Sequence, residues 1–95
     1  MMLMKSMAQE VGKHKIRVNA IGPGAIKTRI NKQIWETKAA EEHVLKLIPY
    51  KRLGNTEDVA KVAAWLACDE SEYVHGTTIF VDGGMTLYPG FDTGG

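Results

Sequence analysis

Apolar positions recur every three or four residues at the start of the chain, at Met4, Met7, Ala8 and Val11. This spacing predicts a helix over residues 1–12 that Gly12 ends. A stripe rich in methionine is also found on adaptable partner surfaces, although an ordinary helix that faces a core or a neighbouring subunit is the more frequent case. We therefore expect this helix to bury its apolar stripe.

Two short apolar segments rich in β-branched residues predict strands. The first covers residues 15–21 and ends at Gly22-Pro23-Gly24. The second covers residues 77–81 and ends at Asp82-Gly83-Gly84, where Asp82 is more readily explained as a strand terminator than as a catalytic acid.

The segment between the strands predicts helices. Residues 28–47 show an interrupted helical periodicity, so we expect two short helices, closed by Pro49, rather than one rigid element. A further helix follows Asn55, which provides a cap before an acidic first turn, and runs to about residue 68. Trp65 lies on this helix and is expected to be a core residue.

This order of elements predicts the α/β class. Two apolar strands joined through helical crossovers favour a parallel sheet that is covered by helices. Two strands do not complete such a sheet, so the segment is expected to need neighbouring strands.

Composition narrows the possible partners and location. The 95 residues carry 12 Lys+Arg and 11 Asp+Glu, and a net charge of +1 gives no electrostatic case for nucleic acid or an anionic membrane. No apolar stretch approaches the roughly 18 residues of a membrane span. Cys68 is the single cysteine, so no intramolecular disulfide forms, as is usual in a reducing compartment. We expect a cytoplasmic protein.

The most informative chemistry lies in residues 19–28, at the carboxyl end of the first predicted strand, where open α/β sheets bind ligands. Glycines there allow a ligand to approach the backbone, and Thr28 is placed to cap the next helix and to direct its hydroxyl at an anion. A tight strand-to-helix turn without a ligand explains the spacing equally well. The third glycine of a dinucleotide fingerprint would fall on Lys27, so this is not the pyrophosphate loop of a first Rossmann turn.

Other candidate chemistry is weak. The three histidines, His14, His43 and His75, lack ligand-like spacing, so we expect surface residues and no metal site. Arg52 is expected to have a structural role, contacting a helix C-terminus or Glu57.

At this point the spaced motifs resemble the C-terminal part of the short-chain dehydrogenase/reductase family. The matching segments, which cover most of the chain in the family's order, are Ile16-Arg17-Val18-Asn19, Pro23-Gly24-x-x-x-Thr28, Arg52-x-Gly54-x-x-Glu57-Asp58-Val59-Ala60, Ala64-Trp65-Leu66-Ala67 and Gly76-x-x-x-x-Val81-Asp82-Gly83-Gly84. Within the family, residues 22–26 and 82–91 look like those of bacterial glucose 1-dehydrogenases.

The resemblance implies the C-terminal portion of one Rossmann-type domain, a doubly wound parallel sheet, over residues 1–95. It implies oxidation of an alcohol group, such as that of a sugar like glucose, by hydride transfer to NAD or NADP. Pro23, Gly24 and Ile26 would line the nicotinamide, Thr28 would bond the pyrophosphate, and residues 28–50 would form a substrate lid. The full-length form would be a homo-oligomer, a tetramer.

The same resemblance implies that the catalytic residues lie outside the chain. The family's general base is a tyrosine with a lysine four residues later, assisted by a serine, because the lysine charge lowers the pKa of the tyrosine. The residues four positions after Tyr50, Tyr73 and Tyr88 are Gly54, Thr77 and Asp92. The pair is therefore expected upstream of Met1, and the chain alone is expected to be inactive. A non-catalytic oligomerisation module and a remnant of a truncated gene are the alternatives.

Overall fold

A computed structural model of the chain describes residues 2–87. The helices and strands, in chain order, are α1 (Met2–Val11), β1 (Ala20–Pro23), α2 (Lys38–Leu45), α3 (Thr56–Leu66) and β2 (Thr78–Val81). Three 3-10 turns lie between them, at Gly12–His14, Lys32–Ile34 and Asp69–Ser71. The end of the tail that resembles glucose 1-dehydrogenases, residues 88–91, lies outside the described residues.

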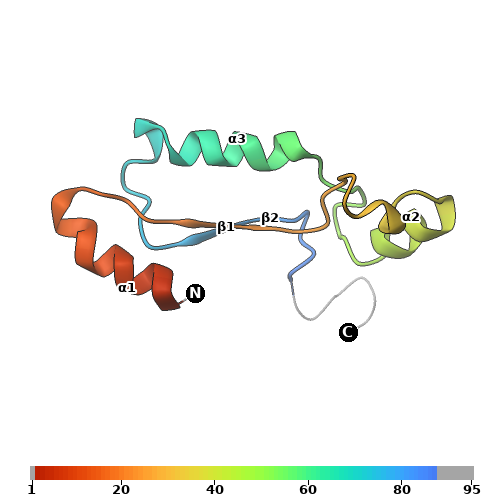
Figure 1. Ribbon diagram of the computed structural model, residues 1–95, viewed down its shortest axis with the longest axis horizontal. Coiled ribbons are helices and arrows are strands. Elements are labelled where there is room, and N and C mark those ends of the chain that lie inside the picture. Colours follow the sequence, from red (N-terminus) through yellow and green to blue (C-terminus); the bar gives the residue numbers. More distant parts are fainter. Residues whose placement is uncertain (1, 88–95) are drawn as a thin grey trace.

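The two strands form a parallel sheet, as the sequence predicts. Ala20 lies opposite Thr78 and Pro23 opposite Val81. Figure 1 shows α3 along one side of the strands, α1 beside the start of β1 on the other side, and α2 beyond their carboxyl ends. The α/β class is therefore confirmed, with only two strands of a sheet in the described part.

The first strand begins later than the sequence predicts, at Ala20 rather than at residue 15. The Asn19 side chain bonds backbone groups that would otherwise be available to extend the pairing of the two strands. Its amide nitrogen donates to Val74 O at 2.9 Å, and its amide oxygen accepts from Thr77 N at 3.1 Å. Pro23 fits inside the strand because the N–H of the next residue, Gly24, bonds Val81 O, and successive N–H groups of an extended chain point in opposite directions. The proline nitrogen lies on the opposite, unpaired edge.

The first helix ends at Val11, directly before Gly12, as the sequence predicts. A 3-10 turn begins at Gly12, and the left-handed residue that follows it is Lys15, with φ 61°. Met4 and Ala8 of the predicted stripe are buried, whereas Met7 is 46% exposed. Only part of the stripe therefore meets the rest of the chain.

The other helices agree with the sequence pattern. The Lys32–Ile34 turn and α2 are the two short helices expected between residues 28 and 47. The cap of α3 is a capping box, in which Asn55 and Asp58 exchange side-chain and backbone hydrogen bonds. At the other end of α3, the buried Ser71 hydroxyl bonds the carbonyl groups of its last turn.

Few side chains are fully covered. Among the described residues the buried ones are Met4, Ala8, Val44, Ile48 and Ser71. Helix α3 buries none, and the expectation that Trp65 is a core residue is wrong, because this side chain is 40% exposed. The molecule measures 50 × 30 × 23 Å, so its helices and strands spread out instead of enclosing one core.

Candidate functional site

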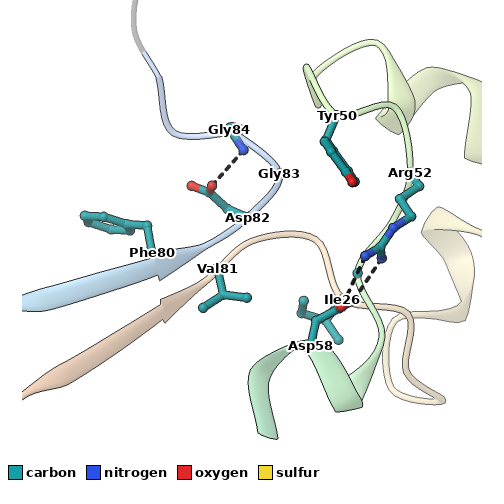
Figure 2. Close-up of a pocket in the computed structure, with 10 residues that line it drawn as sticks. Ile26, Tyr50, Arg52, Asp58, Phe80, Val81, Asp82, Gly83 and Gly84 are labelled. Carbon is teal, nitrogen blue, oxygen red and sulfur yellow. Dashed lines mark hydrogen bonds and ion pairs between the residues drawn. The ribbon is translucent and has the colours of Figure 1, made fainter. Parts of the chain in front are cut away.

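A cleft of about 400 Å³ lies where the carboxyl ends of both strands meet the loop before α3. Figure 2 shows the residues that line it. One side is formed by Ile26, Tyr50, Arg52, Gly54 and Asp58, and the other by residues 80–84 at the end of β2. This is the edge at which the sequence predicts a ligand.

The turn after β2 forms one wall. Asp82 accepts hydrogen bonds from Gly84 N at 2.8 Å and from the Thr86 hydroxyl and backbone N–H. These bonds, the hydroxyl bond above all, lower the pKa of the Asp82 carboxyl. Gly83 follows with φ 62°. Asp82 is thus a strand terminator, as predicted.

Gly24 lies against this turn. A Cβ atom at position 24 would come within 2.5 Å of Asp82 Cβ and 2.8 Å of its Cα. The close approach of the two strand ends therefore requires glycine there. This contact accounts for Gly24 as a packing residue, whether or not a ligand is bound.

Ile26 connects the cleft to the loop before α3 through an isolated parallel bridge with Gly54. Gly54 N donates to Ala25 O at 3.0 Å, and Lys27 N donates to Gly54 O at 2.8 Å. Because successive peptide groups of an extended chain point in opposite directions, the Ile26 N–H faces away from Gly54. Within residues 2–87 this N–H has no hydrogen-bond acceptor.

Thr28 is held by Asn31. Its backbone N–H and its hydroxyl both donate to Asn31 Oδ1, at 2.9 and 2.8 Å. The expectation that Thr28 caps the next helix is wrong, because Asn31 is the residue that precedes the Lys32–Ile34 turn. The Thr28 hydroxyl is thus already engaged.

An ion pair between Arg52 and Asp58 lines the cleft beside Tyr50, and the sequence predicts it only in part. Arg52 has the expected structural role, but it bonds Asp58, at 2.9 and 3.1 Å, and not Glu57. Asp58 lies one residue further along the first turn of α3, on the side that faces the loop. The Arg52 guanidinium also lies 5.6 Å from the centre of the Tyr50 ring.

Of the four predicted site residues, only Ile26 lines the cleft. Pro23 is exposed, Gly24 packs against Asp82, and Thr28 lies beside Asn31. Sequence reasoning missed Asn31 and Tyr50. Asn31 had a usable signal, since an Asn in a loop just before a helical turn often bonds nearby backbone groups.

Metal-ligand clusters and membrane-spanning helices have requirements that the described part of the chain does not meet. No group of His, Cys, Asp and Glu residues there is arranged to hold a metal ion. The three histidines are exposed, and their position at the surface agrees with the sequence prediction. None of the described helices has the length and apolar character needed to cross a membrane.

Comparisons with known proteins identify the family. A family model described as enoyl-(acyl carrier protein) reductase matches residues 1–86. The chain belongs to the short-chain dehydrogenase/reductase family. It is 54% identical over 93 residues to 3beta-hydroxysteroid dehydrogenase 1 of Eggerthella lenta and 47% identical over 88 residues to glucose 1-dehydrogenase 2 of Bacillus subtilis. These matches cover 98% and 93% of this chain.

Solved structures of this family share the fold. A 4-hydroxyisoleucine dehydrogenase complexed with NADH matches 88% of this chain with a TM-score of 0.84 and 32% identity. A dehydrogenase from Agrobacterium tumefaciens with bound NADP matches 87% of it with a TM-score of 0.81 and 38% identity. The two strands and their helices are therefore part of a Rossmann fold. The chain spans about a third of the length of these relatives and structures.

Short-chain dehydrogenases/reductases depend on NAD(P), and the described residues fit part of that cofactor. A carboxamide oxygen accepts hydrogen bonds, and the Ile26 N–H at the strand end is a donor without an acceptor in residues 2–87. The Thr28 hydroxyl is a second donor, although it must exchange Asn31 for any new acceptor. The residues at the end of β1 are thus compatible with the nicotinamide half of NAD(P).

Proposed function

We propose that this chain is the C-terminal third of an NAD(P)-dependent short-chain dehydrogenase that oxidises an alcohol group by hydride transfer. The observation that carries the proposal is the outward-facing Ile26 N–H beside the cleft at the carboxyl ends of β1 and β2. The order of motifs from Asn19 to Gly84 supports the C-terminal assignment.

The proposed roles are limited to binding and positioning. Ile26 would bond the nicotinamide carboxamide through its backbone, while Pro23 and Gly24 would hold the strand end against the ring. Thr28 would bond the pyrophosphate. The cofactor supplies the hydride acceptor, and the tyrosine and lysine that handle the substrate proton would lie outside these 95 residues.

We propose a sugar such as glucose as the substrate. The similarity to glucose 1-dehydrogenase 2 supports it, and the similarity to a 3beta-hydroxysteroid dehydrogenase makes a steroid alcohol the competing candidate. Residues 28–50, the proposed lid, carry an exposed Ile30 beside exposed charged residues such as Arg29 and Lys32. A sugar would use the charged side chains of this surface and a steroid its apolar one, so the activities with both substrates are compared in the same assay.

A chimera tests the proposal. The corresponding third of Bacillus subtilis glucose 1-dehydrogenase 2 is replaced by residues 1–87 of this chain, and formation of NAD(P)H is measured with glucose and with a 3β-hydroxysteroid. We expect alcohol-dependent NAD(P)H formation, with glucose as the preferred substrate. A folded chimera that reduces neither NAD nor NADP would contradict the proposed function. A preference for the steroid would show that the substrate is a steroid alcohol and not a sugar.

Two variants of this chimera separate the backbone of Ile26 from its side chain. Ile26→Pro removes the N–H, whereas Ile26→Ala keeps it and shortens only the side chain. The proline variant should lose affinity for NAD(P) at least about tenfold more than the alanine variant, since only proline removes the proposed hydrogen-bond donor to the cofactor. Equal effects of the two substitutions would show that the N–H does not bind the cofactor.

The exposed apolar side chains support a second candidate, an oligomerisation module without catalysis. Leu3 of α1 is 76% exposed and Trp65 of α3 is 40% exposed, so both helices have apolar surface that further polypeptide can cover. The partner would be another copy of a family member, as in the proposed homo-oligomer. Co-expression with an intact relative, followed by size-exclusion chromatography, should give co-elution, and separate elution would exclude this candidate.

A further inference from the structure

One side-chain amide, that of Asn31, bonds both ends of the segment that contains the proposed cofactor contacts. Its Nδ2 donates to Ile26 O at 2.6 Å, and its Oδ1 accepts from Thr28 N and Thr28 Oγ1. Trp35 Nε1 reaches the same oxygen at 3.3 Å. Three donors therefore converge on Oδ1, and one N–H of the same amide bonds Ile26 O.

The contact with Ile26 fixes one peptide group at both of its ends. The peptide between residues 26 and 27 has its carbonyl on Asn31 and its N–H on Gly54 O. The preceding peptide is held only by its carbonyl, on Gly54 N, which leaves the Ile26 N–H facing outward. Asn31 thus holds the chain in the orientation that presents this N–H.

Trp35 strengthens the same arrangement. Its indole N–H donates to Thr28 O at 2.9 Å, and the Lys27 ammonium group lies 4.7 Å from the centre of its ring. Residues 26–28 are consequently bonded on one side by Gly54 and on the other by Asn31 and Trp35. The backbone at this strand end is ordered by these two side chains together with the bridge to Gly54.

From this geometry we infer that Asn31 is a positioning residue for the cofactor, acting through Ile26 and Thr28. The inference rests on the proposed function, since it concerns the same segment. Asn31 holds Ile26 so that the N–H of Ile26 points toward the proposed cofactor site. Asn31 also accepts the hydrogen bond of the Thr28 hydroxyl, which would exchange this acceptor for the cofactor. Loss of this amide releases both contacts together.

Hydrogen exchange on the 95-residue chain tests the geometric part without any cofactor. In Asn31→Ala the Thr28 amide should exchange at least about tenfold faster, because its acceptor is removed. Gln33→Ala is the matched control, since Gln33 is an exposed amide side chain two positions further on. Unchanged exchange at Thr28 in the Asn31 variant would overturn the inference, whatever the cofactor experiments show.

A second variant, Asn31→Asp, keeps the inference testable if the alanine variant does not fold. Asn31→Asp keeps the acceptor oxygen and removes the donor to Ile26 O, so Thr28 should stay protected while the contact with Ile26 is lost. If the alanine variant unfolds, the aspartate variant still decides the question. An unprotected Thr28 amide in a folded Asn31→Asp chain would contradict the assigned contact.

Kinetics of the chimera test the functional part. Asn31→Ala should raise KM for NAD(P) about tenfold and change kcat less than about threefold, because a displaced binding segment weakens cofactor affinity more than the chemistry. Gln9→Ala, which removes an exposed amide side chain of α1 outside the proposed lid, should leave both constants unchanged. A lowered or unchanged KM in Asn31→Ala would overturn the positioning role. Inactivity of the unsubstituted chimera would instead contradict the proposed function, and the exchange experiment would still decide the role of Asn31.

Discussion

The Arg52 guanidinium donates to both carboxylate oxygens of Asp58, with Nη1 2.9 Å from Oδ2 and Nη2 3.1 Å from Oδ1. The same carboxylate accepts the Asn55 N–H at 2.8 Å, which completes the cap of α3. One side chain therefore joins the loop that borders the cleft to the first turn of the helix behind it. The bond from Arg52, followed by that from Asn55, lowers the pKa of Asp58 to about 2.

This pKa predicts an acid dependence of stability. The Asp58 carboxylate stabilises the folded chain above its ordinary pKa of 3.8, and this contribution is lost as the pH falls through about 2. Asp58→Asn should therefore lower the Tm near neutral pH and flatten the decline of Tm between pH 4 and pH 2, followed by circular dichroism. Glu57→Gln is the control, since Glu57 shares the first turn but not the bond to Arg52. Equal effects of the two substitutions would contradict the assigned role.

Gly24 and Gly22 should respond differently to alanine. At Gly24 the added Cβ meets Asp82 Cβ at 2.5 Å, where backbone must move, whereas at Gly22 it meets the ring of Phe80, which is 60% exposed and free to rotate. We expect Gly24→Ala to destabilise the chain by about 2 kcal/mol or more and Gly22→Ala by clearly less. Urea unfolding of both variants measures the difference, and the reverse order would contradict the packing described here.

His75 links three separate segments of the chain. Val18 N donates to its Nδ1 at 3.2 Å, so Nε2 carries the proton and donates to Ala8 O at 2.7 Å. His75→Ala should loosen α1, which is seen as faster hydrogen exchange of its amides and a loss of about 1 kcal/mol of stability. His43→Ala, on the exposed side of α2, should change neither quantity. If α1 amides exchanged at the same rate in both variants, the link would be disproved.

Structural features that depend on neighbouring residues are predictable from this sequence, whereas features that depend on contacts between distant residues are not. The cap at Asn55 and the turn at Asp82 follow from residues within four positions, so the sequence pattern identifies them. The start of β1 depends on Asn19 meeting Thr77, 58 residues away, and no local pattern reports that contact. The strand was therefore predicted five residues too early.

In the candidate site, too, local features are predictable from the sequence and long-range contacts are not. Ile26 lines a cleft at the carboxyl end of β1, and a local pattern of glycines after a strand was enough to single out this edge. The bond from Arg52 to Asp58 instead of Glu57 depends on how the loop meets the first turn of α3. The exposure of Trp65 depends on which layers cover that helix, and an amphipathic pattern identifies the apolar face without identifying what covers it.

We propose that these 95 residues supply groups that position the cofactor and that the catalytic base belongs to another part of the enzyme. The most direct test compares the purified chain alone with the chain mixed with Bacillus subtilis glucose 1-dehydrogenase 2 from which the corresponding third has been deleted. NAD(P)H formation with glucose is measured in both samples, with the deleted relative alone as the control. We predict no turnover by either part and measurable turnover by the mixture. Glucose-dependent NAD(P)H formation by the 95-residue chain alone would contradict the account.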